Sequence, residues 1–305
     1  MSLYFAYGSN LDAENWREFC ARHSAQPESM RPVGPAMLPD VELVFNYRSV
    51  LRPGGALNIR QRKGQFVHGA LFEVSEHGWD ILDLKESVAA GCYRRITHTA
   101  ITAGGKTVPV VTYQVTRQRT EGFVPPSDVY TRIVRRGLAA FGLPEHQYEK
   151  AATDEIAHKE VDGVFVYGTL MTGESRHSAI VRHEPHELHP AHAPGRLHET
   201  SEDYPTLDVH HDDADACVRG EFVQFSDTAQ VLEALDHVEE FRGYGLHRQE
   251  YVRSLLEVDA GRGSRRLAWT YVTGDRSLLG RHIESGCWRS HRAAARGDGE
   301  ASAPA

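Results

Sequence analysis

The chain has 305 residues, of which 40% are hydrophobic and 25% charged, and its formal net charge is −8. These proportions are ordinary for a globular protein, and the length suits two domains of about 150 residues each. The acidic balance argues against a nucleic-acid partner, no apolar run is long enough to span a membrane, and no signal peptide is expected. Four scattered cysteines without a Cys-x-x-Cys pair predict reduced thiols and a cytoplasmic location.

The first half is predicted to consist of strands and turns with three helices. A short apolar strand leads into a Tyr-Gly turn, and a helix follows at residues 12–22, acidic at its start and basic at its end. Ser75 and Ser127 are placed to cap two further helices, and Gly142 ends the second of these. Further strands are predicted over residues 41–47, 56–60, 67–74, 96–101 and 108–115.

The second half repeats this order in a shorter form, without a counterpart of the helix after Ser127. One helix is predicted over residues 228–238, and strands over residues 164–167, 219–225, 251–258 and 266–272. The last residues are mostly Ala, Gly, Asp and Glu, too polar to bury a core. We therefore predict domains at residues 1–157 and 158–292, followed by a disordered tail at residues 293–305.

One stretch of sequence opens each half. The first copy reads Phe5-Ala-Tyr-Gly-Ser-Asn-Leu11, and the second reads Phe165-Val-Tyr-Gly-Thr-Leu-Met171. A tight turn after a strand presents successive backbone N–H groups, which can hold a carboxylate or an oxyanion. A Leu-Asp-x-x-Glu motif follows each copy, ending at Glu86 and at Glu239. Each half therefore pairs a turn of backbone donors with one carboxylate, the minimum for acid/base chemistry on an anionic substrate.

Either glutamate taken singly would be interpreted as a solvated carboxylate, since most glutamates are exposed. The repeated context favours a functional role, and the register of the motif selects Glu239 over its neighbour Glu240. An arginine follows each glutamate at the same spacing, Arg95 in the first half and Arg248 in the second, which extends the match between the halves.

At these motifs the chain resembles the gamma-glutamylcyclotransferases, which carry a Tyr-Gly-Ser/Thr loop and a later catalytic glutamate in a Leu-Asp-x-x-Glu context. The first half, with Gly91-Cys-Tyr-Arg94 and Pro125-Pro-Ser-Asp-Val-Tyr130, is similar to the members that act on gamma-glutamyl amino acids. The second half, ending in Ile283-Glu-Ser-Gly-Cys-Trp288, is similar to the gamma-glutamylamine cyclotransferase relatives, including the type that unmasks a protected aminoglycoside. Where the family usually has glycine after the glutamate, this chain has Ser87 and Glu240.

The resemblance implies an α+β fold of two tandem domains, each a small mixed β-sheet curled into a partial barrel with flanking helices. It also implies the reaction: the alpha-amine of a small gamma-glutamyl amide attacks its own gamma-carbonyl and releases 5-oxoproline and a free amine, with no metal or organic cofactor. Glu86 and Glu239 would carry the proton. The implied substrate-binding residues are Tyr7, Gly8, Ser9, Asn10, Leu11, Tyr130, Tyr167, Gly168, Thr169 and Leu170.

Several interpretations stay open from the sequence. Both domains could be catalytic, one could only bind substrate or a partner, or the whole chain could be a non-catalytic binding protein. The released amine could be an amino acid, cysteinylglycine from glutathione, or a biosynthetic intermediate unmasked by the reaction. Because the second half lacks the helix after Ser127, we expect its cleft to be more open or to be closed by another surface. We expect the second site to take the larger amine.

Two other chemistries have weaker support. Residues 210–217 are rich in His and Asp, but they read as a polar loop without the regular elements that hold metal ligands. Ser9 lacks the Gly-x-Ser-x-Gly elbow of a serine hydrolase. We therefore predict no metal site and no hydrolase triad.

Overall fold

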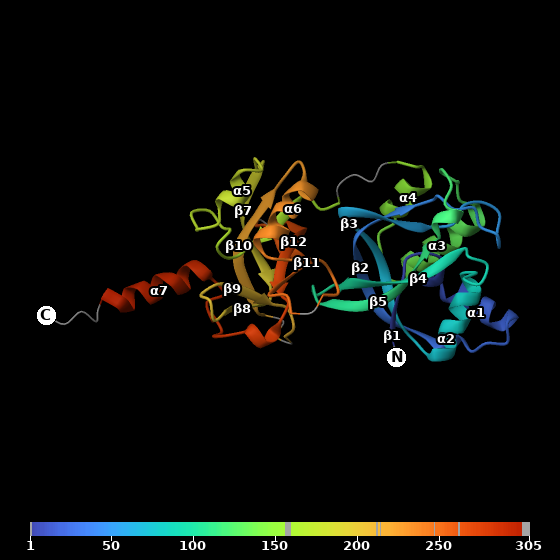
Figure 1. Cartoon of the computed structure of the whole chain (residues 1–305), viewed down its shortest axis with the longest axis horizontal. Coiled ribbons are helices and arrows are strands. Elements are labelled where there is room, and N and C mark those ends of the chain that lie inside the picture. The colour runs from blue at the N-terminus through green and yellow to red at the C-terminus, as the bar shows by residue number, and fades with distance from the viewer. Residues whose placement is uncertain are drawn as a thin grey trace. The chain divides into compact units, whose positions relative to one another are not determined.

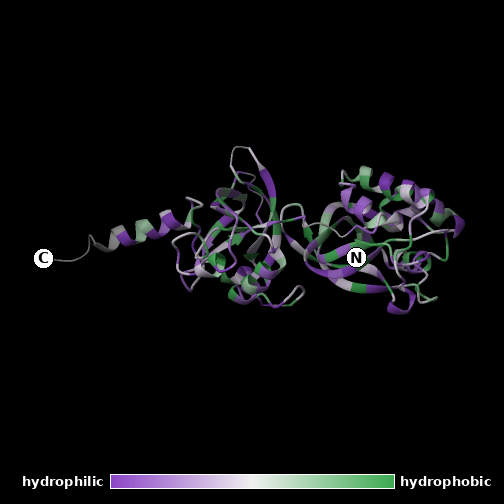
Figure 2. Ribbon diagram, turned by 90° about the horizontal axis from the view of Figure 1, so that it is seen from above, coloured by the Kyte–Doolittle hydropathy of each residue, from purple (hydrophilic) through white to green (hydrophobic). Residues whose placement is uncertain are grey.

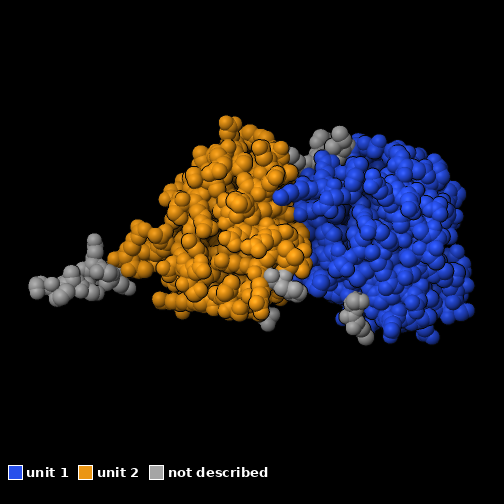
Figure 3. Space-filling view, viewed as in Figure 1, with its two compact units in different colours: residues 1–103, 107–160 blue, residues 104–106, 161–305 orange. Residues whose placement is uncertain are grey.

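The computed structural model describes residues 2–155, 160–211, 213, 215–246, 248–261 and 263–300. The chain divides into two compact units, residues 1–103 with 107–160 and residues 104–106 with 161–305 (Figure 3). The domain boundary predicted between residues 157 and 158 lies outside the described residues.

Unit 1 is a closed five-stranded barrel in the order β1-β3-β2-β4-β5, in which β1 and β5 pair in parallel and the other neighbours are antiparallel. Figure 1 shows its helices outside the strands. The strands are β1 (Ser2–Ala6), β2 (Met30–Val44), β3 (Asn58–Val74), β4 (Tyr93–Thr102) and β5 (Thr107–Val115). The helices are η1 (Ser9–Leu11), α1 (Ala13–Arg22), η2 (Pro27–Ser29), α2 (Glu76–Lys85), η3 (Arg117–Arg119), α3 (Asp128–Ala140) and α4 (His146–Ala152).

Unit 2 has the same strand order, β6-β10-β7-β11-β12, again closed by one parallel pair, β6 with β12. The barrel strands are β6 (Gly163–Val166), β7 (Glu187–Pro194), β10 (Cys217–Gln224), β11 (Tyr251–Asp259) and β12 (Arg265–Thr273), and β8 (Arg196–Glu199) and β9 (Pro205–Asp208) form a separate two-stranded sheet. The helices are α5 (Ser178–Val181), α6 (Thr228–Val238), η4 (Arg276–Leu278) and α7 (Trp288–Glu300). The expected α+β architecture of two barrel domains is confirmed.

A glycine allows the first strand of each barrel to lie close to its neighbour. A Cβ atom on Gly69 would lie 2.3 Å from the Ala6 carbonyl oxygen, and one on Gly220 would lie 2.2 Å from that of Val166. Neither position can therefore carry a side chain without moving the backbone. This close pairing fixes the strand that leads into each Tyr-Gly turn.

Each Leu-Asp-x-x-Glu motif ends a helix that packs against its barrel. Helix α2 is capped by the Ser75 hydroxyl, and Glu86 is its C-cap residue; helix α6 ends in the same way, with Glu239 as its C-cap. The next residues, Ser87 and Glu240, have φ values of 52° and 51°, in the left-handed region that glycine occupies most easily. The family usually has glycine at this position, and glycine adopts this left-handed conformation without strain.

Two strands extend beyond what the sequence predicted. Residues 56–60 and 67–74 were expected to form separate strands, but Asn58–Val74 is one continuous strand paired with β2. Strand β2 contains Pro32, Pro35 and Pro39 and accommodates them with two register shifts. Because proline is rare within strands, the sequence predicted only its end, at residues 41–47. Strand β7 has two prolines as well and was not predicted.

Helix α7 overlaps the segment for which we expected no order. It runs to Glu300, well past residue 293, and Figure 2 shows mostly hydrophilic residues along it, next to the C label. Its first turns are anchored, since Trp288 is buried and Arg289 donates to Glu221 at 2.9 Å. Beyond these turns, alanine and arginine have high helix propensity, so the helix continues although it does not pack against the core. Among the described residues, no helix is long and apolar enough to cross a membrane.

Candidate active sites

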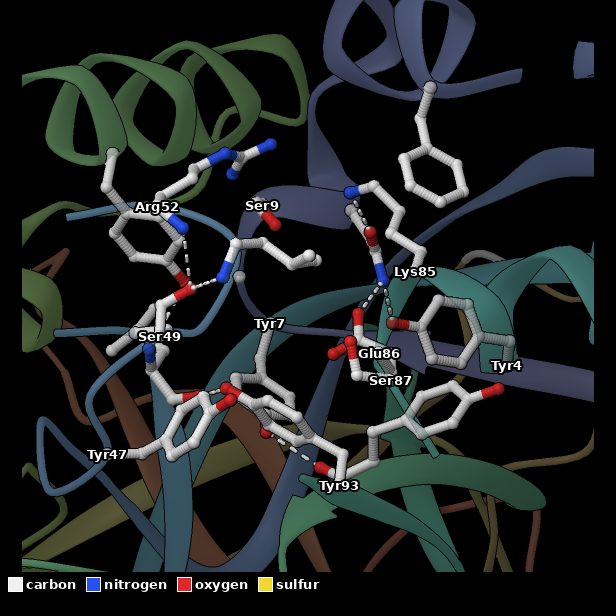
Figure 4. A pocket seen from close by; sticks show the side chains of 18 of the residues that line it. Tyr4, Tyr7, Ser9, Tyr47, Ser49, Arg52, Lys85, Glu86, Ser87 and Tyr93 are labelled. Atoms are coloured by element: carbon white, nitrogen blue, oxygen red, sulfur yellow. Dashed lines mark hydrogen bonds between the residues drawn. The ribbon is translucent and has the colours of Figure 1, made fainter. Parts of the chain in front are cut away.

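The unit 1 site lies where the turn after β1 meets the end of α2 (Figure 4). Gly8 begins the short helix η1, and its carbonyl oxygen accepts from the N–H of Leu11 at 3.0 Å. The hydroxyl of Tyr130, from α3, lies 3.3 Å from where a Gly8 Cβ would be, so a side chain at this position would have to displace that hydroxyl slightly. The turn thus presents backbone rather than side chain to the pocket.

Glu86 is held in this pocket by an amide. The Asn10 side-chain nitrogen donates to Glu86 Oε1 at 2.7 Å and also contacts the hydroxyl of Tyr4 at 2.8 Å. The other end of the same amide, Oδ1, accepts from the ammonium of Lys85 at 2.6 Å. Burial raises the pKa of Glu86 above the usual value, while Lys85 and the Asn10 hydrogen bond oppose that rise. The site therefore favours the protonated form of Glu86 more than water does, while two neighbours stabilise its charged form.

Tyrosines form much of the remaining wall. The Tyr7 hydroxyl donates to the Tyr113 carbonyl at 2.7 Å, and the Tyr93 hydroxyl donates to the Leu57 carbonyl at 2.7 Å. The N–H of Leu57 donates to the Tyr130 hydroxyl at 3.2 Å. Burial raises the pKa of all four tyrosines above the usual value, so their hydroxyl groups stay protonated at neutral pH.

The cavity between these groups has a volume of about 200 Å³. Arg22, Arg52 and Lys85 also line it. Among the described residues, none of the three forms an ion pair: Arg52 donates to the neutral side chain of Asn15 at 2.7 Å, and Lys85 donates to Asn10. The cavity therefore combines one carboxyl group with three positive charges that have no carboxylate partner, an arrangement that suits an anionic ligand.

The unit 2 site is built from the equivalent elements. Tyr167, Gly168, Thr169 and Leu170, at the turn after β6, line a pocket together with Glu239. The hydroxyl of Tyr167 donates to the Tyr271 carbonyl at 2.7 Å, and that of Tyr251 donates to the Pro205 carbonyl at 3.0 Å. These two bonds match those of Tyr7 and Tyr93 in unit 1. Both units thus place one glutamate among tyrosines beside a Tyr-Gly turn.

The two glutamates nevertheless have different surroundings. Glu239 is 8% exposed, and among the described residues its carboxyl group has no hydrogen-bond partner, because Leu170 takes the place of Asn10. Burial raises the pKa of Glu239 to about 7, with a smaller contribution from Glu250, and only the charge of Arg176 opposes it. Glu239 is therefore close to half protonated at neutral pH.

The unit 2 pocket is also smaller, with a volume of about 30 Å³. Pro205 covers the turn: its Cγ lies 2.4 Å from where a Gly168 Cβ would be. Arg176 closes another side, with its guanidinium stacked 4.8 Å from the centre of the Tyr204 ring. Of the two outcomes expected for this cleft, a more open one or one closed by another surface, the second describes unit 2, because Pro205 of β9 and Arg176 close it.

Comparison with known proteins identifies the family. A family model described as gamma-glutamyl cyclotransferase, AIG2-like, matches residues 164–290, and an AIG2-like family model matches residues 66–150. The gamma-glutamylcyclotransferase of Bos taurus is 32% identical over 152 residues, which cover 48% of this chain and 75% of the bovine protein. The chain belongs to the gamma-glutamylcyclotransferase family.

Further relatives agree with this assignment. The gamma-glutamylcyclotransferase of Homo sapiens is 32% identical, covering 48% of this chain and 76% of the human protein. The gamma-L-glutamyl-butirosin B gamma-glutamyl cyclotransferase of Niallia circulans is 30% identical over 42% of this chain and 76% of that protein. A solved gamma-glutamyl cyclotransferase structure is 31% identical and covers 52% of this chain and 90% of that one, with a TM-score of 0.43. The curated sequence relatives show that the chain is an enzyme of the gamma-glutamylcyclotransferase class.

Most residues that the sequence singled out in this cyclotransferase do lie together. Glu86 shares the unit 1 cavity with Tyr7, Gly8, Ser9, Asn10 and Tyr130. Leu11 is the exception, and its assignment to the substrate-binding set needs correction. Leu11 is 1% exposed and packs against Gly137. Its N–H donates to the Gly8 carbonyl and is therefore not available to a substrate. Leu11 anchors the turn in the core instead of lining the pocket.

The arginine match proposed from sequence spacing is wrong. In unit 1 the Arg95 guanidinium pairs with Asp83 at 2.6 Å, and Tyr113 donates to the same carboxylate. The group that makes these contacts in unit 2 is Arg253, which pairs with Asp236 at 2.7 Å. Arg248 lies instead in the longer connection before β11, with a φ of 58°. The connection between α6 and β11 is longer than the one between α2 and β4, so equal spacing along the sequence does not identify the equivalent arginine.

Sequence reasoning also missed several residues of the two candidate sites. Lys85 was overlooked because a lysine at the end of a helix is common for electrostatic reasons alone. Arg52 lies on the connection between β2 and β3, where no motif marks it. Tyr93 and Tyr251 each begin the strand after a motif helix, and that shared position was a usable signal. Among the described residues, no group of three or more His, Cys, Asp or Glu side chains could hold a metal ion.

Proposed function

We propose that unit 1 cyclises a gamma-glutamyl amide, with Glu86 carrying the proton between the two nitrogen atoms of the reaction. The observation that carries this proposal is the Glu86 carboxyl group, held by Asn10 beside the Tyr-Gly turn in a cavity of about 200 Å³. Burial raises the pKa of Glu86 above its usual value, and a carboxyl group with a raised pKa is better suited to return a proton after accepting it.

In this reaction the alpha-amino nitrogen of the substrate attacks its own gamma-carbonyl carbon and closes a five-membered ring. The Glu86 carboxylate accepts a proton from that nitrogen as the new C–N bond forms. It returns the proton to the leaving nitrogen as the amide C–N bond breaks, so that 5-oxoproline and a neutral amine result. Because nucleophile and carbonyl belong to one molecule, holding the curled conformer can supply an effective molarity of about 10^5–10^8 M.

The turn after β1 would hold the negative charge of the substrate. The first N–H groups of a helix have no acceptor within it, and those of Ser9 and Asn10 begin η1 at the cavity. They are suited to a carboxylate of the gamma-glutamyl group or to the oxyanion that forms on its gamma-carbonyl oxygen. Tyr7 and Tyr93 would shape the cavity around the curled chain, since both hydroxyl groups are already engaged by backbone carbonyls.

The released amine would be an amino acid or a small peptide. A gamma-glutamyl amino acid carries two carboxylates, one at each end. Arg22 and Arg52 line the cavity without a carboxylate partner among the described residues, so they are available to the second carboxylate. An amide of a simple amine would leave these charges unmatched.

Unit 2 supports a different role. The unit 2 cavity, at about 30 Å³, is several times smaller than the unit 1 cavity of about 200 Å³. We therefore infer that turnover comes from unit 1, and that unit 2 keeps the carboxyl group without the space to cyclise a substrate.

A substrate panel tests the proposal. The full chain is incubated with gamma-glutamyl amino acids, glutathione and gamma-glutamyl amides of uncharged amines, and 5-oxoproline is measured by mass spectrometry. We expect 5-oxoproline from the amino-acid substrates and much less from the uncharged amides. No 5-oxoproline from any member of the panel would refute the proposed reaction. Equal rates across the panel would refute the role given to the arginines.

A further inference from the structure

The Lys85 ammonium is buried next to the proposed proton carrier without contacting it through a hydrogen bond. Lys85 is 7% exposed, and its nitrogen donates to Asn10 Oδ1 at 2.6 Å. Burial lowers the pKa of Lys85 to about 8, with Glu86 acting in the opposite direction. Burying an ammonium group is costly. A buried lysine bound to a neutral amide at the end of a surface helix therefore has a specific reason to be there.

That reason is the orientation of the Asn10 amide. An asparagine side chain has a donor end and an acceptor end, and which end faces a neighbour depends on the bonds it makes. Lys85 can only donate, so it fixes the Asn10 oxygen on its own side and turns the nitrogen towards Glu86 and Tyr4. The Asn10 amide thus bridges Lys85 and Glu86, which are both labelled in Figure 4.

We propose that Lys85 is a positioning residue, which locks the Asn10 amide as a hydrogen-bond donor to Glu86 and so holds the Glu86 carboxyl group with its second oxygen available to the substrate. This inference rests on the proposed role of Glu86 and extends it. Among the described residues, Oε2 of Glu86 has no hydrogen-bond partner, as the reacting oxygen of a proton carrier requires.

Unit 2 provides an internal comparison. There the residues in the positions of Asn10 and Lys85 are Leu170 and Val238, and Glu239 receives no amide hydrogen bond among the described residues. With only Arg176 to oppose burial, the pKa of Glu239 rises to about 7. The unit with the larger cavity thus has the lysine and the asparagine together, and the unit with the smaller cavity has neither.

Other charged and titratable groups also face Glu86, and each must be accounted for in a pH experiment. Arg52, from the β2–β3 connection, lowers the pKa of Glu86, whereas Asp83, from α2, raises it. The phenolic groups around it are those of Tyr4, Tyr7, Tyr93 and Tyr130. These tyrosines stay neutral at ordinary pH, so Lys85 is the group whose removal changes both the charge and the geometry.

Replacing Lys85 has a predictable sign. In Lys85→Met the Asn10 amide is free to turn its oxygen towards Glu86, and an acceptor beside a carboxyl group favours the protonated form. The lost positive charge acts in the same direction. The carboxylate form then appears only at higher pH, so the acidic limb of kcat/KM moves to higher pH, and a shift of about one pKa unit lowers kcat/KM on that limb by about tenfold.

The titration of Glu86 is measured directly, on the full chain, by NMR of protein labelled with ¹³C at the glutamate side-chain carboxyl groups. Glu86→Gln assigns the signal, and Lys150→Met, a matched loss of one lysine from α4, is the control. We expect the Glu86 midpoint to rise in Lys85→Met, to return towards wild type in Lys85→Arg, and to stay unchanged in Lys150→Met. Since this readout needs no turnover, it tests Lys85 even if the proposed reaction fails.

A double-mutant cycle separates positioning from simple charge. If Lys85 acts through the amide, Lys85→Met changes the Glu86 midpoint much less in an Asn10→Leu background than in wild type. Full additivity of the two changes, or an unchanged midpoint in Lys85→Met, would overturn the proposal. If Lys85→Met does not fold, as judged by circular dichroism, Lys85→Gln takes its place in the cycle, because glutamine can still donate to Asn10 Oδ1. Lys85→Gln is then expected to keep the amide orientation and to shift the midpoint less than Asn10→Leu does.

Discussion

Replacing Glu239 by glutamine should stabilise unit 2, and only at neutral and alkaline pH. The carboxyl group is 8% exposed and has no hydrogen-bond partner among the described residues, so its charged form is unfavourable in the fold. Glutamine has nearly the same shape and is neutral at every pH. The substitution therefore removes a buried negative charge without creating a large cavity.

The magnitude follows from the pKa. Burial raises the pKa of Glu239 from 4.5 to about 7, and each unit is equivalent to about 1.4 kcal/mol. The folded-state pKa is raised, so the unfolded chain ionises first, and folding is progressively penalised as pH increases from about 4.5 to about 7. Above that range the penalty reaches about 3 kcal/mol, which Glu239→Gln should relieve. Below the unfolded pKa both states hold the proton, and the substitution should change little.

The assay is urea unfolding of the full chain at pH 4 and pH 8, followed by pulsed hydrogen exchange and mass spectrometry of peptides from β11 and β12. These strands report on unit 2 separately from unit 1. Glu240→Gln is the matched control, because its side chain is 80% exposed at the next position. We expect a gain at pH 8 for Glu239→Gln alone. Destabilisation at pH 8, or an equal change at both pH values, would refute the reasoning that Glu239 is a buried acid with a raised pKa.

Three further substitutions test the fold. Arg253→Met should destabilise unit 2 by about 3–5 kcal/mol because it removes the cation that pairs with the buried Asp236 carboxylate. Arg248→Met should change the free energy of unfolding by less than about 0.5 kcal/mol. The reverse order in urea unfolding would restore the sequence-based match. Ser87→Gly should raise the stability of unit 1 by about 1 kcal/mol, since serine is strained at a φ of 52°; a lower melting temperature by calorimetry would contradict this.

The motif residues could be predicted because their geometry is local. A Tyr-Gly turn after an apolar strand and a glutamate at the end of a helix each follow from a few adjacent residues, and the repeat selected Glu239 over Glu240. The helix caps Ser75 and Ser127 were readable for the same reason. The features that could be predicted are therefore those set by a few neighbouring residues.

The residues that could not be predicted depend on distant parts of the chain. Pro205 closes the unit 2 pocket from a hairpin whose position over Gly168 no local pattern reveals. Arg253 replaces Arg248 because the connection before β11 is longer than its unit 1 counterpart. Lys85 is adjacent to Glu86 in sequence, but its role appears only once the fold brings Asn10 to it.

The central claim is that Glu86, and not Glu239, carries the proton in turnover. The most direct measurement is the rate of 5-oxoproline formation from one gamma-glutamyl amino acid by full-length wild type, Glu86→Gln and Glu239→Gln. A positioned acid/base group contributes about 10^2–10^4-fold, so Glu86→Gln should lose at least about a hundredfold in kcat while remaining folded. Glu239→Gln should keep the wild-type rate. Wild-type turnover by Glu86→Gln, or loss of turnover in Glu239→Gln alone, would contradict the account.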